Sequence, residues 1–146
     1  MNTPLAGLRV LDFSTLLPGP FATLYLADLG ADVIHIESPT RPDLVRIMLP
    51  YANGQATAHS YLNRNKQSIT LDLKDRASID KIYAKIQEVD IVVEQFRPGV
   101  MTRLGLDYAT LSALNPALIY CSITGYGQTG TYRDRAGHVI NYVALS

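Results

Sequence analysis

The sequence predicts an α/β fold with a mostly parallel sheet, and three observations support this. Residues 8–37 read as strand, turn, helix and strand (LRVLDFSTLLPGPFATLYLADLGADVIHIE). Strand-like and helix-like segments continue to alternate after them, as they do in parallel sheets with crossover helices. The hydrophobic content of 47% and the charged content of 18% are those of a globular domain. Because a strand–helix–strand unit of about thirty residues crosses over in the right-handed sense, the expected sheet is Rossmann-like.

The first strand–helix–strand unit contains a start and a stop signal for its helix. Residues 8–13 are mostly apolar and have the length of a strand. Pro20 is expected at the first helical position, where its missing N–H would be unpaired anyway. Residues 21–29 are apolar nearly all round, which predicts a helix buried against the sheet. Gly30 provides a left-handed stop, and residues 33–36 begin a second buried strand.

The middle of the chain contains a long loop and then a second set of alternating elements. Residues 38–66 are rich in proline and show little periodicity, and a loop of this length is usually functional or covers something. Residues 68–73 alternate like a strand, and residues 79–89 have apolar side chains at helical spacing, with Asp75 placed to cap the helix. Residues 90–94 (DIVVE) read as a buried parallel strand.

The last part of the chain supplies two short helices and one more strand. A short helix is expected to end near Leu104, and a second covers residues 108–114, with Asp107 as its cap. Residues 117–124 form a strand that leads into the glycine-rich segment 125–130. The loops that follow the strands are therefore expected at one edge of the sheet, where ligands of such sheets bind.

Composition and charge exclude several classes of protein. Thirteen basic and thirteen acidic residues balance, so the broad positive field of a nucleic-acid binder is missing. The single cysteine, Cys121, is expected to be a small buried packing residue, and one cysteine fits a reducing compartment, the cytoplasm or a reducing organelle. No signal peptide and no apolar run of about 20 residues is present, so we expect a soluble protein without a membrane span. The chain stops at Ser146 inside an apolar segment, and we interpret this as a cut.

Three cations follow strand ends and raise the question of a phosphate-bearing ligand. The turn after the first strand (STLLPGP) lacks the G-x-G-x-x-G fingerprint, which argues against a dinucleotide. Lys74 follows the third strand, Arg97 the fourth, and Arg103 lies six residues further on. Together they could hold a phosphorylated nucleotide through charge-assisted hydrogen bonds. The alternative is that each is a solvated residue or a salt-bridge partner.

His138 is the candidate for proton-transfer chemistry. It follows a glycine-rich loop, and histidine can take or return a proton near neutral pH. Spacing alone favours the alternative of a hydrogen-bonded histidine at a helix start. His35 and His59 are expected to be structural, and no Ser-His-Asp order or metal-ligand spacing occurs, so no metal is expected.

Five blocks of the chain resemble a known superfamily. They are residues 8–37, NRNKQSITLDLKD, FRPGVMTRLGLD, NPALIYCSITGYGQTG and RAGHVINYVALS. In this order they resemble the family III CoA-transferase superfamily (CaiB/BaiF type), and within it the alpha-methylacyl-CoA racemase branch. The resemblance implies that residues 1–146 are the N-terminal, CoA-binding Rossmann-like portion of the large domain. The rest of that domain and a small domain would be absent, and the full-length chains would form an interlocked homodimer.

The resemblance also assigns roles to individual residues. His138 matches the catalytic histidine of the racemases, which moves a proton at the α-carbon of a 2-methylacyl-CoA. The acyl-CoA thioester is then the substrate and no further cofactor is implied. The residues that the resemblance places in contact with CoA or the thioester are Leu71, Asp72, Leu73, Lys74, Gln95, Phe96, Arg97, Arg103, Gly137, Val139, Ile140, Asn141 and Tyr142.

Departures from the family pattern leave three functions open. Ser38 stands where the family has an arginine, and Val139 where racemases commonly carry an aspartate. The racemase interpretation comes first because of His138, and because Leu17 replaces a glutamine of formyl-CoA-type transferases. The second is a CoA-transferase that moves CoA between carboxylic acids. The third is an inactive fragment that at most binds CoA and exposes apolar surface, because the acidic partner of either reaction would lie beyond Ser146.

Overall fold

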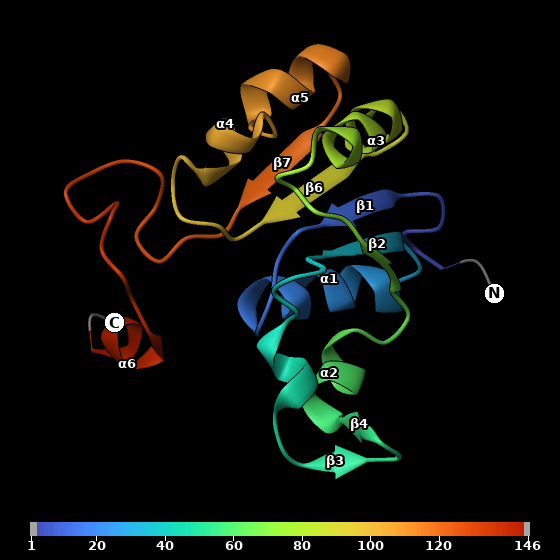
Figure 1. Ribbon diagram of the computed structural model, residues 1–146, viewed down its shortest axis with the longest axis vertical. Coiled ribbons are helices and arrows are strands. Elements are labelled where there is room, and N and C mark those ends of the chain that lie inside the picture. The colour runs from blue at the N-terminus through green and yellow to red at the C-terminus, as the bar shows by residue number, and fades with distance from the viewer. Residues whose placement is uncertain (1–2, 145–146) are drawn as a thin grey trace.

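The computed structural model describes residues 3–144 and contains a parallel sheet with the strand order β5-β2-β1-β6-β7 (Figure 1). This sheet confirms the predicted Rossmann-like α/β fold. Its strands are β1 (Arg9–Asp12), β2 (Asp32–Glu37), β5 (Gln67–Thr70), β6 (Ile91–Glu94) and β7 (Ile119–Ser122). The helices are α1 (Pro18–Asp28), α2 (Thr57–Leu62), α3 (Arg76–Ile86), α4 (Val100–Leu104), α5 (Tyr108–Leu114) and α6 (Val139–Val143).

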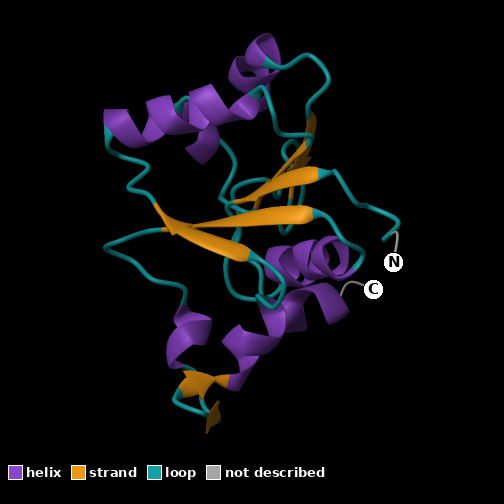
Figure 2. Cartoon of the chain, turned by 90° about the vertical axis from the view of Figure 1, so that its right-hand side faces the viewer, coloured by secondary structure: helices purple, strands orange, loops and turns teal. Residues whose placement is uncertain are grey.

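Helices cover both faces of the sheet and create two apolar layers. Helices α3, α4 and α5 lie on one face and α1 on the other (Figures 1 and 2). The larger core cluster contains Ile82 and Ile86 of α3, packed with Val92 of β6 and Leu111 of α5. The smaller cluster packs Ala27 of α1 against the strands. Burial on both faces explains why the central strands are nearly continuous apolar runs.

The two predicted aspartate caps are confirmed. The Asp75 carboxylate accepts a hydrogen bond from the Ser78 backbone N–H at 3.1 Å, and α3 begins directly after it. The Asp107 carboxylate accepts from the Thr110 N–H at 2.9 Å and starts α5. Each side chain satisfies a backbone donor that the first turn of a helix leaves unpaired.

Helix α1 differs from the prediction in two ways. It begins at Pro18, so Pro20 is not its first residue. It is also not buried all round, because Phe21 and Tyr25 of the helix and Leu29 directly after it recur every four residues and are exposed by 38%, 57% and 44%. Residues at this spacing lie on one face of a helix. An apolar sequence cannot reveal which of its faces will remain open to solvent.

The long loop contains more structure than its sequence suggests. A 3₁₀ helix (Leu44–Ile47) precedes a two-stranded hairpin of β3 (Tyr51–Ala52) and β4 (Gln55–Ala56), and α2 follows directly. These short elements extend away from the sheet below α1 (Figure 1).

The end of the described chain leaves apolar surface uncovered. Cys121 of β7 is exposed, so the expectation of a buried packing residue is wrong: β7 is an edge strand.

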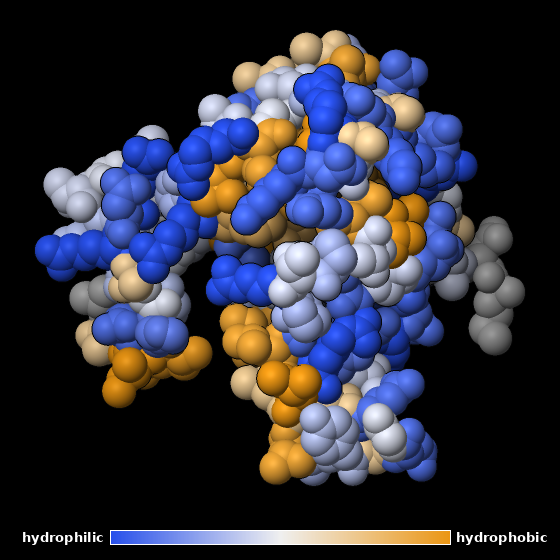
Figure 3. Space-filling model, viewed as in Figure 1, coloured by the Kyte–Doolittle hydropathy of each residue, from blue (hydrophilic) through white to orange (hydrophobic). Residues whose placement is uncertain are grey.

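In α6, Val139 and Ile140 are exposed by 69% and 76%, and Figure 3 shows hydrophobic surface where Figure 1 places this helix. No helix within residues 3–144 is both long and apolar enough to cross a bilayer.

Candidate functional site

A cavity lies at the carboxyl edge of the sheet, beyond β6 and β7. All five strands of this sheet are parallel, so the loops after them meet at this edge, as predicted. The cavity has a volume of about 470 Å³, within the range of small-molecule sites. We call it the His138 cavity. It is lined by Pro18, Gln95, Phe96, Arg97, Pro98, Ile123, Thr124, Gly125, Arg133, Arg135, Ala136, Gly137, His138 and Tyr142.

His138 lies on the wall of this cavity and is exposed. It directly precedes α6, and its backbone N–H donates to the Asn141 Oδ1 at 2.9 Å. The prediction of a helix-start histidine and the prediction of a ligand-facing histidine are therefore compatible. The backbone of His138 is anchored locally, and the residue lines the same cavity as Arg97.

Glycines near His138 make room for a tyrosine. A Cβ added at Gly125 or Gly137 would overlap the ring and hydroxyl of Tyr142. Tyr142 also lies 5.7 Å from Tyr126 between ring centroids, and Tyr126 lies 5.8 Å from Tyr132. Such distances are typical of attractive aromatic pairs. The loop before His138 is thus held by packed rings, with glycines where the backbone meets them.

Gln95 also lines the cavity, and both ends of its side-chain amide make hydrogen bonds. Its Oε1 accepts a hydrogen bond from the Gly19 N–H at 3.0 Å, and its Nε2 donates to the Thr15 carbonyl at 2.5 Å. These bonds join β6 to the segment between β1 and α1 (residues 13–17, the β1–α1 turn) and to the first turn of the helix. The Gly19 Cα is so close to Ser14 and to the Gln95 Oε1 that a Cβ there would overlap both.

Asp43 holds the same turn from the other side. Its carboxylate oxygens accept from the Leu16 N–H at 3.1 and 3.2 Å, and Asp43 is buried. Leu16 has a φ of 62°, a conformation that a leucine adopts only when its surroundings impose it. Asp43 and Gln95 therefore fix the backbone that brings Pro18 to the cavity.

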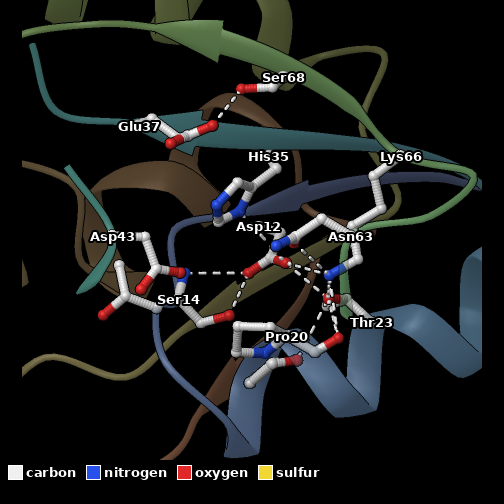
Figure 4. Close-up of polar contacts among 12 residues, drawn as sticks. Asp12, Ser14, Pro20, Thr23, His35, Glu37, Asp43, Asn63, Lys66 and Ser68 are labelled. Carbon is white, nitrogen blue, oxygen red and sulfur yellow. Dashed lines mark hydrogen bonds and ion pairs between the residues drawn. The ribbon is translucent and has the colours of Figure 1, made fainter. Parts of the chain in front are cut away.

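A buried polar network lies beneath the β1–α1 turn (Figure 4). The Asp12 carboxylate at the end of β1 accepts from the Ser14 N–H at 2.9 Å, the Thr23 Oγ1 at 2.5 Å and the Lys66 Nζ at 3.3 Å. The His35 Nδ1 lies 3.5 Å from the Asp12 Oδ2, and neither nitrogen of the His35 ring makes a hydrogen bond within the described residues. The expectation that His35 is structural agrees with its burial.

Charges set the ionisation of this network. Burial alone would raise the pKa of Asp12, but the His35 ring 3.5 Å away and the charge of Lys66 lower that pKa to about 2. Burial lowers the pKa of Lys66, and the Asp12 charge opposes this effect. Neither Asp12, His35 nor Lys66 lines the His138 cavity. We therefore assign the network to support of the turn and not to chemistry.

Glu37 at the end of β2 is paired in the same region. It accepts from the Arg46 Nε at 2.7 Å and also bonds the Arg46 Nη2 and the Ser68 hydroxyl. The Arg46 hydrogen bond is the main cause that lowers the pKa of Glu37 to about 2. This pairing connects the 3₁₀ helix, and with it Asp43, to the sheet.

A second, smaller cavity of about 220 Å³ lies beside β6, β7 and α4. Arg97 and Pro98 line both cavities. In the second cavity Glu94 is buried, and this burial raises its pKa, while its Oε2 accepts from the Phe96 N–H at 2.8 Å. Within residues 3–144 no group of three His, Cys, Asp or Glu side chains could hold a metal ion.

Six of the residues assigned by resemblance line the His138 cavity: Gln95, Phe96, Arg97, Gly137, His138 and Tyr142. The others do not line either cavity. Leu71 and Leu73 pack against the larger core, and the Asp72 Oδ1 accepts from the Lys74 N–H at 2.9 Å in a turn. Lys74, Arg103, Val139, Ile140 and Asn141 are exposed.

Two arginines of the cavity were missed in the sequence. Arg133 and Arg135 line it together with Arg97, but they come from the loop after the glycine-rich segment and not from a strand end. A search for cations in every loop of the carboxyl edge would have found them. For the Asp12–Lys66 pair the indication in the sequence was weaker: Asp12 is an acid at the end of an otherwise apolar strand.

Comparisons with known proteins are consistent with this geometry. The sequence model of the family described as CoA-transferase family III matches residues 5–146. The chain is 46% identical to an acetyl-CoA:oxalate CoA-transferase of Acetobacter aceti over 87% of its length, which covers 33% of that relative. It is 42% identical to the human succinyl-CoA:glutarate CoA-transferase over 92% of its length, which covers 31% of that relative. The chain thus spans about a third of the length of these curated relatives.

A solved structure agrees closely with the fold. The crystal structure of a CAIB/BAIF family protein from Brucella suis matches with a TM-score of 0.92 and 41% identity. The match covers 99% of this chain and 39% of that one.

Proposed function

The chain belongs to CoA-transferase family III, and we propose that it is the CoA-binding portion of an enzyme that moves CoA between carboxylic acids. The observation that carries the proposal is the kinship with relatives named as CoA-transferases, at 42% and 46% identity over most of the chain. The racemase interpretation, which His138 and Leu17 placed first, receives no support from these names. Transfer between acids is therefore the better conclusion.

The His138 cavity supports binding of a CoA thioester. Arg97, Arg133 and Arg135 line it, and its lining contains no carboxylate. Guanidinium groups bind phosphate and carboxylate through paired, charge-assisted hydrogen bonds. We propose that Arg97 binds the CoA phosphates together with Arg103 and Lys74, which lie outside the cavity.

His138 has a different role in transfer than in racemisation. In transfer, an attacking carboxylate replaces the thiolate of CoA at the acyl carbon, and no proton leaves the α-carbon. His138 would then donate a hydrogen bond to the acyl oxygen, on which negative charge develops. In a racemase it would take the α-proton itself. Its exposure on the cavity wall keeps racemisation as the second candidate.

One experiment separates the candidates. The protein is incubated in heavy water with succinyl-CoA, 2-methylbutyryl-CoA and an acceptor acid such as glutarate, and the products are read by mass spectrometry. We expect glutaryl-CoA to form. We also expect the α-carbon of 2-methylbutyryl-CoA to remain free of deuterium. The chain is assayed both as given and extended to the length of its relatives, because it spans about a third of their length.

Other outcomes would replace the proposal. Deuterium at the α-carbon without glutaryl-CoA would establish racemisation, and a loss of this exchange in His138→Ala would confirm the catalytic histidine. If the extended protein binds CoA but catalyses neither reaction, it is a CoA-binding protein without either activity.

A further inference from the structure

Positive charge gathers in the lining of the His138 cavity. Arg97, Arg133 and Arg135 line it, and no aspartate or glutamate does. Within the described residues, no carboxylate lies within ion-pair distance of Arg97 or Arg135, and the Arg133 Nε is 4.0 Å from the Asp134 Oδ1. Cations in a concave site attract anions more strongly than cations on a flat surface do. The cavity therefore favours a ligand with more than one negative group.

Arg133 and Arg135 have different neighbours. The Arg133 Nη2 and the Arg103 Nη1 both reach Gly99, where a Cβ would lie 3.6 and 3.7 Å from them. Arg133 thus extends the group that we propose for the CoA phosphates. Arg135 lies on the chain three residues before His138, and its guanidinium carbon is 4.6 Å from the centroid of the Tyr132 ring. This contact restrains the guanidinium without using its hydrogen-bond donors.

We propose that Arg135 is a specificity-determining residue that binds the distal carboxylate of a dicarboxylic acyl group. The proposal rests on the proposed function, because it needs the thioester beside His138. Arg135 lines the same cavity as His138, so the second carboxylate of an acyl group whose thioester lies beside His138 would find a guanidinium in that cavity. The planar guanidinium can bind both oxygens of a carboxylate at once. The acids in the names of the two relatives, oxalate and glutarate, each carry two carboxylates.

The test compares two thioesters that differ only at the far end of the acyl group. Succinyl-CoA carries a carboxylate where butyryl-CoA carries a methyl group. Isothermal titration measures the affinity of the chain for both compounds and for free CoA. We expect succinyl-CoA to bind about tenfold more tightly than butyryl-CoA, which corresponds to about 1.4 kcal/mol. In Arg135→Gln this preference disappears, while the affinities for butyryl-CoA and CoA stay within about twofold of wild type, less than 0.5 kcal/mol.

A matched control and a second variant make the test specific. Arg76→Gln removes an arginine from the exposed start of α3, where it pairs with Asp80, and the preference for succinyl-CoA should remain. Arg133→Gln should weaken all three compounds by a similar factor, as expected for a phosphate contact.

Each remaining outcome is decisive. An equal loss of all three compounds in Arg135→Gln would mean that Arg135 binds CoA phosphate, and would overturn the inference. An unchanged preference in Arg135→Gln, or no preference in wild type, would overturn it too while leaving the proposed function standing. Failure of wild type to bind any of the three compounds would refute the proposed function, and the inference with it.

Discussion

Replacement of Lys66 by methionine tests the buried network most sharply. The side chains of Lys66 and Asp12 are exposed by only 1% and 0%, and the Lys66 Nζ contacts the Asp12 Oδ2 at 3.3 Å. The same ammonium donates to the Pro20 carbonyl at 2.9 Å and to the Thr23 Oγ1 at 2.8 Å, in the first turn of α1. Lys66→Met keeps most of the volume of the side chain but leaves the Asp12 carboxylate without its ammonium.

The expected loss of stability follows from this geometry. Removing one partner of a buried ion pair costs about 3–5 kcal/mol, because the other charge stays buried and unpaired. With a urea m-value of about 1–3 kcal/mol/M, the unfolding midpoint should fall by roughly 1–5 M. The loss should shrink as the pH falls from 7 to 4, because Asp12 without Lys66 can take up a proton and become neutral.

Urea unfolding followed by circular dichroism measures these effects in three variants. Lys85→Met is the matched control, because Lys85 pairs with Glu88 on the surface and its loss should hardly move the midpoint. The double variant Asp12→Asn/Lys66→Met removes both charges and should recover much of the stability. A midpoint for Lys66→Met equal to that of Lys85→Met, at every pH, would refute the structural role of the network.

Two further predictions concern the β1–α1 turn and the loss of stability at acidic pH. Gly19→Ala should lower the free energy of unfolding by about 1–3 kcal/mol, since its Cβ would overlap Ser14 and the Gln95 Oε1. An unfolding midpoint of Gly19→Ala equal to that of wild type would contradict the close approach. Asp12 and Glu37 have pKa values lowered to about 2, so their carboxylates stabilise the fold above about pH 4, and this contribution is lost as the pH falls toward 2. For Asp12 the contribution is about 2 kcal/mol, and a stability that stays constant between pH 5 and pH 2 would contradict it.

Much of the fold could be predicted because local signals agreed with the global arrangement. Asp75 and Asp107 begin helices where their side chains satisfy backbone donors, and the apolar runs of the central strands reflect helices on both faces. Exposure was the part that local patterns could not determine. Cys121 and Tyr25 lie in apolar segments like those of the core, but only the arrangement of the elements shows that their faces are open.

The site was predictable where a residue follows a strand directly. Arg97 was found this way, whereas Arg133 and Arg135 reach the cavity through the path of a long loop, which no periodicity encodes. The assignment of Gln95 to the site was consistent with its position, but its amide supports the β1–α1 turn. Such a role depends on contacts across about 80 residues of sequence, and spacing does not reveal it.

The central claim is that a CoA thioester binds in the His138 cavity, between Arg97 and the segment before α6. Titration of the chain, isotopically labelled, with CoA and observation of its backbone amide signals by NMR would test this most directly. We predict that the signals of residues 95–97 and 133–138 shift together, with one affinity, while those of α3 and its core contacts stay in place. Shifts confined to other surfaces, or none at saturating CoA, would contradict the account.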